Sequence, residues 1–181
     1  MDTNALSNDV RELFSKNISS QIDESFKCVV EASPALSLLN ANRLDVVAKY
    51  AFANSIINSL PCDFIEDLYL EHIKVFNGFV EADESGKVGS QSFLNSFKEL
   101  IHSILAQGYS DSSPIPLSED RVALDGAHRL GISIATGQNV FAVPTNIKSR
   151  RFDYKYVLYR GLQRKYLDFM ALEYSKLKPN T

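Results

Sequence analysis

The strongest constraint on the fold is a change of periodicity within residues 122–137, VALDGAHRLGISIATG. The apolar run 122–124 is typical of a strand, and it ends at the polar pair Asp125 and Gly126. A helical pattern then continues to Gly137, which is placed to end the helix. The sequence therefore predicts a corner at which a strand ends and a helix begins.

The segments around the corner predict an α+β fold. Residues 93–108, FLNSFKELIHSILAQG, carry one apolar helical stripe, and Gly108 is expected to end that helix in a left-handed conformation. The runs SPIPL (113–117) and RVAL (121–124) predict two strands joined by a tight turn, and NVFAVP (139–144) predicts a third strand. The predicted order is helix, strand, strand, helix, strand.

The chain divides in sequence near residue 80. Helical patterns at 8–31, 42–58 and 63–79 predict a helical N-terminal annex over residues 1–80. The polar segment EADESGKVGS (81–90) breaks the pattern, and residues 81–181 are expected to form the domain that holds the corner. A last apolar pattern at 162–179 predicts a C-terminal helix that docks on the domain or on a partner.

Composition and charge narrow the class of protein. With 181 residues and 45% hydrophobic content, the chain is large enough to bury a core. It shows no apolar run long enough for a membrane span and no signal-peptide pattern, so we expect a cytoplasmic protein. A net charge of −3 argues against attraction of the whole surface to nucleic acid. Cys28 and Cys62 lack metal-ligand spacing and are expected to be small buried side chains.

The predicted corner has the residues of a phosphate-binding site. The first N–H groups of a helix have no intrahelical acceptor, and the helix dipole adds partial positive charge there. Gly126 allows an anion to approach the backbone, while His128 and Arg129 offer further donors. Asp125 would sit beside the anion and could bind a cation or transfer a proton, or it could simply cap the helix. The spacing alone leaves both interpretations of Asp125 open.

Residues 93–143 resemble the ParB/sulfiredoxin-like nucleotide-binding fold. The resemblance lies in a helix, a "PI" strand, a hairpin and a "DGxHR" corner that follow one another in this order. It implies a small mixed sheet with flanking helices. In sulfiredoxins and the related free-serine kinases, the glycine, histidine and arginine of this motif hold nucleotide phosphates. The resemblance thus implies nucleotide binding at Gly126, Ala127, His128 and Arg129.

Departures from each relative decide which activity can be expected. Sulfiredoxins need a cysteine immediately before the His-Arg pair, and this chain has Ala127, so sulfiredoxin activity is not expected. ParB proteins carry a basic corner and a downstream helix-turn-helix, which this chain lacks, so DNA is not an expected partner. The serine-kinase relatives have an aspartate before the glycine and a glutamate upstream of the long helix. Asp125 and Glu81 stand in comparable places.

The resemblance is nearest to the kinases and implies a nucleotide-dependent phosphotransferase. Such an enzyme needs ATP or a related nucleotide, Mg²⁺, and a group that positions or deprotonates an acceptor hydroxyl. Asp125 is the expected metal ligand or base, and Glu81 is the other candidate base. Asp83 could replace Glu81, and Glu81 could equally be a solvated loop carboxylate. The alternative is a non-catalytic nucleotide-binding or interaction module with the same pocket.

Two histidines and a basic segment are further candidates for function. His72 and His102 lie within helical patterns and are left out of the catalytic set. The basic segment KSRRFDYKY (148–156) could contact a phosphorylated substrate or nucleic acid, or be a solvated connector. More loosely, the whole chain resembles the N-terminal region of bacterial proteins of surface-polysaccharide biosynthesis. That likeness favours a sugar or polyol hydroxyl as acceptor, and it would make this chain part of a longer protein.

Overall fold

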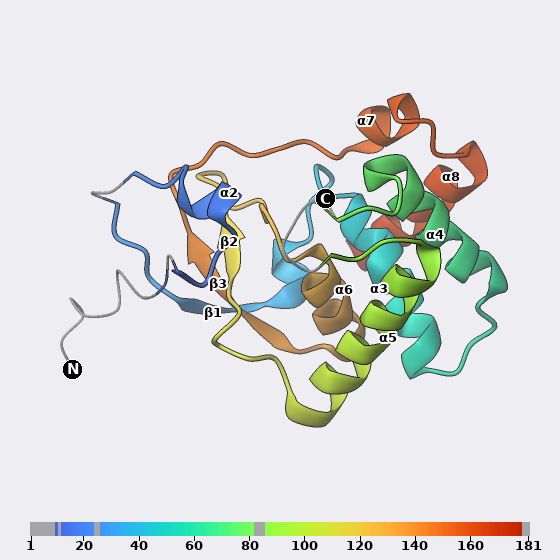
Figure 1. Cartoon of the computed structure of the whole chain (residues 1–181), viewed down its shortest axis with the longest axis horizontal. Helices are drawn as coiled ribbons and strands as arrows, with labels where there is room; N and C mark the ends of the chain where they lie inside the picture. The colour runs from blue at the N-terminus through green and yellow to red at the C-terminus, as the bar shows by residue number, and fades with distance from the viewer. Residues whose placement is uncertain (1–9, 11, 24–25, 82–85, 179–181) are drawn as a thin grey trace.

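The structure is a computed structural model that describes residues 10, 12–23, 26–81 and 86–178. It has the predicted α+β architecture, with helices, a small mixed sheet and a C-terminal helix (Figure 1). The elements are α2 (Lys16–Ser19), β1 (Glu31–Pro34), η1 (Ala35–Leu38), α3 (Asp45–Ile57), α4 (Asp63–Asn77), α5 (Ser90–Gln107), β2 (Ile115–Leu117), α6 (Ala127–Thr136), β3 (Asn139–Pro144), α7 (Tyr154–Tyr159) and α8 (Arg164–Leu177).

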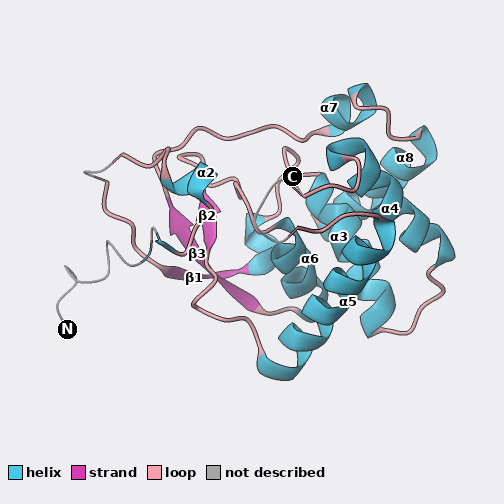
Figure 2. Ribbon diagram, viewed as in Figure 1, coloured by secondary structure: helices cyan, strands magenta, loops and turns pink. Residues whose placement is uncertain are grey.

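The sheet has the strand order β1-β3-β2. β1 runs antiparallel to β3 with Glu31 opposite Ala142, and β2 runs parallel to β3 with Ile115 opposite the same residue. Because β2 and β3 are parallel, the chain must cross over between them, and α6 is that crossover. Figure 2 shows the strands at one end of the molecule and most of the helices gathered at the other. The crossover places the start of α6 between the two regions.

The predictions for the long helices are confirmed. The patterns at 42–58, 63–79 and 93–108 form α3, α4 and α5, and the C-terminal pattern forms α8. α3, α4, α5 and α6 enclose a largely aromatic core whose central members are Phe52, Tyr69, Phe97, Ile101 and Ile132. The Phe52 ring stacks on the Tyr69 ring with centroids 5.0 Å apart. This packing explains why each helix carries one or more apolar stripes.

The helical prediction for residues 8–31 is wrong. Among the described residues of this range, Val10, Glu12 and α2 are helical, whereas residues 13–15, 20–23 and 26–30 are not, and the chain leads into β1 instead of continuing as one helix. The apolar residues of this region pack as a group against the far side of the sheet, where Ile18, Ile22 and Cys28 join Leu124 and Val143 in one buried cluster. Pairing of β1 with β3 therefore outweighs local helical periodicity.

Two smaller predictions also need correction. The run RVAL is not a strand: Ala123 forms only an isolated bridge to Leu117, and the turn closes through Ser118 N–H donating to the Val122 carbonyl over 2.9 Å. Gly108 does end α5 with a positive φ of 78°, but its ψ of −179° is outside the left-handed helical region. Residues 121–124 and Gly108 each lie at a turn, and the geometry of that turn decides their conformation.

Both sides of the sequence division at residue 80 contribute to the same sheet and core. β1 precedes the division and pairs with β3, which follows it. Val47 of α3 and Leu130 of α6 are fully buried in one cluster. The helices before residue 80 thus support the strand-to-helix corner directly.

α3 and α6 approach each other closely at Gly131. A Cβ atom placed on Gly131 would lie 2.8 Å from the Lys49 Cβ and 2.8 Å from the Tyr50 backbone nitrogen. Such separations do not occur between real atoms, so only glycine permits this contact. The close approach brings the first turn of α6 over the polar residues of α3.

We expect Gly131→Ala to destabilise the protein by about 1–3 kcal/mol, because the new methyl group overpacks the interface between two helices. Helix propensity alone predicts the opposite sign, a gain of roughly 1 kcal/mol. Urea unfolding measures the difference, with Glu99→Ala at an exposed position of α5 as the matched control. A Gly131→Ala protein as stable as the wild type would contradict the close contact.

Candidate functional site

α6 begins at the predicted corner. Gly126 precedes the helix with φ 77° and ψ 24°, a left-handed conformation that favours glycine. The backbone N–H groups of Ala127, His128 and Arg129 belong to the first turn, and no side chain among the described residues caps them. Asp125 is exposed, and its carboxylate accepts the Gly126 N–H over 2.6 Å. It does not cap the first turn, so the three N–H groups at the start of α6 have no hydrogen-bond acceptor among the described residues.

Arg129 lies across the start of this helix. Its guanidinium donates to the Ser113 carbonyl and stays close to Gly126: a Cβ on Gly126 would lie 3.1 Å from Nη2 of Arg129. The same Cβ would lie 3.2 Å from Cγ1 of Ile115 in β2. Glycine at 126 thus serves two purposes, because it supplies the positive φ and leaves space for the guanidinium beside the backbone donors.

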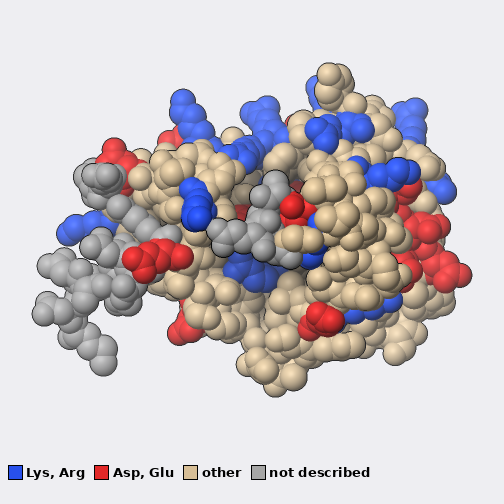
Figure 3. Space-filling model, in the orientation of Figure 1, with Lys and Arg blue, Asp and Glu red and all other residues tan. Residues whose placement is uncertain are grey.

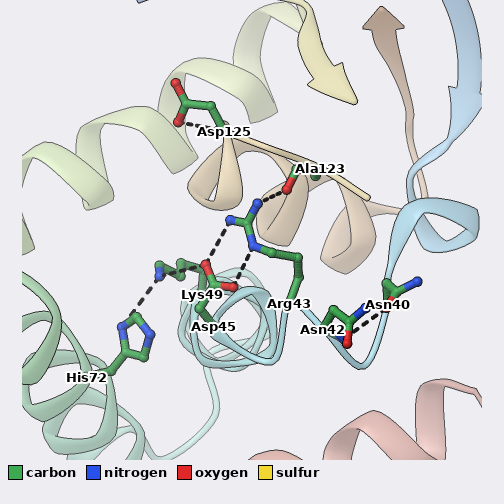
Figure 4. A network of polar contacts seen from close by, with 9 residues as sticks. Asn40, Asn42, Arg43, Asp45, Lys49, His72, Ala123 and Asp125 are labelled. Atoms are coloured by element: carbon green, nitrogen blue, oxygen red, sulfur yellow. Dashed lines mark hydrogen bonds and ion pairs between the residues drawn. The ribbon is translucent and has the colours of Figure 1, made fainter. Parts of the chain in front are cut away.

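A buried ion pair holds residues 121–124, the segment that leads into the corner. Arg43 binds Asp45 through two parallel hydrogen bonds of 2.8 and 2.9 Å, and its remaining nitrogen donates to the Ala123 carbonyl (Figure 4). Both side chains are almost completely buried. Burial would raise the pKa of Asp45, but the positive charges of Arg43 and Lys49 lower it below its usual range. The start of α3 is therefore fixed two residues from Asp125.

Lys49 extends this network toward α4. Its Nζ lies 3.5 Å from the Asp45 carboxylate and 3.4 Å from Nδ1 of His72 (Figure 4). Burial lowers the pKa of Lys49 to about 8, against the attraction of Asp45. Burial also holds the pKa of His72 well below its usual value, so this ring is neutral near pH 7 and Nδ1 can accept from Lys49.

His128 points into the aromatic core. Its Nε2 lies 3.1 Å from the Tyr69 hydroxyl, and its ring meets the Phe97 ring edge-on with centroids 4.6 Å apart. Burial, followed by the charge of Lys49, holds the pKa of His128 well below its usual value. The ring borders a cavity of about 70 Å³ that Lys87 and Ser96 also line. The structure thus directs the His128 side chain to this cavity, while its backbone N–H belongs to the open helix end.

Glu81 lies near the same cavity through its partner. Its carboxylate pairs with Nζ of Lys87 over 2.6 Å, and both side chains are partly exposed. Burial, followed by the charge of Glu81, raises the pKa of the Tyr69 hydroxyl, and Tyr69 also lines this cavity. It is thus an ion-paired carboxylate beside the cavity rather than an isolated loop residue. The other candidate, Asp83, lies outside the described residues.

The sequence analysis missed the network beneath the corner, namely Arg43, Asp45, Lys49 and Tyr69 with the excluded His72. One signal was present: Asp45 and Lys49 stand four residues apart in a helix that is otherwise apolar on several sides. Charged residues on such a helix must be buried, and buried charges must be paired. His102, also excluded, is exposed on α5.

The remaining sequence candidates have simple structural explanations. Cys28 is buried, Cys62 is half-buried, and both are free thiols. The basic segment 148–156 leads into α7, where Asp153 caps the helix by accepting the Tyr156 N–H over 2.9 Å. Figure 3 shows Lys and Arg side chains spread along the edge of the molecule where this segment and α7 lie.

The described residues contain no group of three or more His, Cys, Asp or Glu side chains arranged to hold a metal ion. Within the same part of the chain, no helix has the length and apolar character that crossing a membrane requires.

Comparison with models of known families, with curated proteins and with solved structures found no significant match.

We expect the stability conferred by the buried network to depend on pH through Lys49. Its pKa is about 8 in the folded protein and 10.5 in the unfolded chain, so between these values the unfolded chain binds more protons. Folding stability therefore rises with pH in that window, by up to about 1.4 kcal/mol per pH unit. The comparison is urea unfolding of the wild type and Lys49→Met at pH 7, 8, 9 and 10.

The wild type should gain stability relative to Lys49→Met as the pH rises from 8 to 10. Lys98→Met, which removes a partly exposed lysine of α5, is the control and should show no such trend. A difference between wild type and Lys49→Met that stays constant or falls with pH would show that Lys49 keeps an ordinary pKa.

Proposed function

We propose that the corner at the start of α6 binds the phosphates of a nucleotide and that the protein is a phosphotransferase acting on a hydroxyl of a small molecule or saccharide. One observation carries the proposal: the N–H groups of Ala127, His128 and Arg129 have no acceptor among the described residues, and they lie beside the Arg129 guanidinium and the exposed Asp125 carboxylate. Backbone donors and a guanidinium together suit phosphate oxygens. A carboxylate at the same place suits Mg²⁺.

Under this proposal each residue has a separate task. The N–H groups and Arg129 hold the phosphates, and Gly126 keeps the space for them. Asp125 helps to hold Mg²⁺, which would neutralise phosphate charge when bound. Glu81 accepts the proton of the acceptor hydroxyl once Lys87 is displaced toward the phosphates. The neutral His128, fixed by Tyr69, shapes the cavity next to the helix end.

A non-catalytic nucleotide-binding module is the second candidate. It is favoured by the Glu81–Lys87 ion pair, because Lys87 occupies the carboxylate that would otherwise accept the proton of the acceptor hydroxyl. Such a module needs the phosphate contacts and no essential carboxylate. The two candidates therefore differ in what Asp125 and Glu81 contribute, while both depend on Arg129.

Nucleotide binding is expected to depend on Arg129. Arg129→Ala should weaken the binding of ATP with Mg²⁺ by about 1.5–3 kcal/mol, the scale of a charge-assisted hydrogen bond. Isothermal titration calorimetry measures the affinity, with thermal melting to show that the variant is folded. Arg150→Ala removes an exposed arginine outside the corner and is the control. Unchanged affinity in folded Arg129→Ala protein would rule out its phosphate contact.

Phosphoryl transfer is expected to depend on the two carboxylates. Asp125→Asn or Glu81→Gln should lower the rate of single-turnover transfer by roughly 10²–10⁴-fold, the usual scale for acid-base catalysis. Nucleotide affinity should stay nearly unchanged. The assay uses ATP with Mg²⁺ and a panel of sugars, polyols and amino acids, and Glu99→Gln is the control. Wild-type protein that binds ATP without transfer to any acceptor would favour the non-catalytic module.

A further inference from the structure

A second cavity lies away from the corner, between α8, the start of α3 and the chain that enters α7. Its volume is about 430 Å³, within the usual range of small-molecule sites. Ala41, Leu44 and Ala171 supply apolar lining, and none of the corner residues borders it. We call it the α3–α8 groove. It shares no lining residue with the cavity beside His128.

Two cations line the α3–α8 groove without ion pairs to any described residue. Arg151 and Lys155 are both exposed and belong to the groove wall. Asp120 is near enough to feel the charge of Arg151, but it is already bonded to the hydroxyls of Ser118 and Ser149. With the Asp153 carboxylate counted, the charged side chains of the groove lining are two cations and one anion, an excess of one positive charge. A phosphate monoester carries about −1.5 to −2 charge near pH 7, which matches two cations.

The other polar groups of the groove suit a hydroxylated ring. One carboxylate oxygen of Asp153 is occupied by the Tyr156 N–H, and the other has no donor among the described residues. Tyr154 is oriented by its hydroxyl, which donates to Asp168 over 2.7 Å, and Tyr174 adds a second aromatic side chain to the wall. Aromatic side chains combine an apolar body with a polar tip, and a free carboxylate oxygen accepts hydroxyl protons.

The wall of the groove is held in place by the backbone. Phe152 N–H donates to the Asn42 carbonyl over 2.7 Å, and Leu44 N–H donates to the Phe152 carbonyl over 3.2 Å. The Arg43 guanidinium lies over the Phe152 ring, 5.3 Å from its centroid. The segment that carries Arg151 and Asp153 is thus fixed to the start of α3. A wall held in this way can present its polar groups with little ordering cost on binding.

We propose that the α3–α8 groove binds a sugar phosphate. Arg151 and Lys155 bind the phosphate, the apolar lining with Tyr154 and Tyr174 contacts the sugar ring, and the free oxygen of Asp153 accepts a hydroxyl proton. This site does not depend on the phosphotransferase proposal, because it shares no residue with the corner. Its ligand class follows from two cations that have no ion pair among the described residues and that stand beside two aromatic side chains and a carboxylate.

The test is calorimetric titration of the full chain with glucose 6-phosphate, glucose and inorganic phosphate as separate probes. Glucose 6-phosphate is expected to bind at least tenfold more tightly than either fragment, since only it uses both halves of the groove. Arg151→Ala and Lys155→Ala should each weaken it tenfold or more. Arg164→Ala is the matched control, because Arg164 is exposed at the start of α8 outside the groove, and it should change affinity less than twofold.

Several results would overturn the proposal. The first is no detectable binding of glucose 6-phosphate, and the second is an equal affinity for inorganic phosphate. The third is a loss of affinity in Arg164→Ala as large as in Arg151→Ala, because this would indicate general attraction to a basic surface. Binding that is lost in Arg129→Ala but kept in Arg151→Ala would assign the ligand to the start of α6 instead. Tyr174→Phe should keep most of the affinity and Tyr174→Ala should lose it, so the ring contact is tested in variants that leave both cations in place.

Discussion

The buried pair of Arg43 and Asp45 is the interaction on which the corner depends. Removing two charges from water costs several kcal/mol per ion. Two parallel hydrogen bonds, the contact with Ala123 and the nearby charge of Lys49 offset this cost. A buried pair of this kind is weak evidence for added stability. Its structural effect is clearer, because it joins the start of α3 to a chain segment 80 residues later.

Helix packing places the rest of the site around this pair. Gly131 lets the backbone of α6 approach α3, and the close contact sets the position of the first turn of α6 above Lys49. Gly126 then gives the chain the positive φ that turns it from the preceding segment, residues 121–125, into the helix. Both glycines are needed for different reasons, one for interhelical distance and one for backbone conformation. Together they place beside the Arg129 guanidinium three N–H groups that have no acceptor in the described part of the chain.

The sequence predicted those parts of the fold that are encoded locally. α3, α4, α5 and α8 each carry a helical apolar pattern over several turns, and the corner was recognisable because a strand-like run meets a helical one at Asp125 and Gly126. The N-terminal region was mispredicted because its apolar spacing fits a helix, while its actual partners are Leu124 and Val143 far along the chain. Periodicity contains no information about such distant partners.

The same limit applies to the candidate site. A short sequence motif contains Asp125, Gly126, His128 and Arg129, so the sequence could predict that they lie together. The structure does place them at the start of one helix. The direction of the His128 side chain into the aromatic core depends on Tyr69, 59 residues away, and could not be predicted from the motif. Glu81 reaches the same region only because the chain folds back at Val80 and Val88.

The central claim is that the open N–H groups at the start of α6 bind phosphate. It is tested most directly by following the backbone amide resonances of the ¹⁵N-labelled protein during titration with ATP and Mg²⁺. The account predicts that the largest chemical-shift changes fall on Ala127, His128 and Arg129, because these amides would donate to the phosphates. Changes confined to other parts of the chain, with these three amides unmoved at saturating ATP, would contradict it.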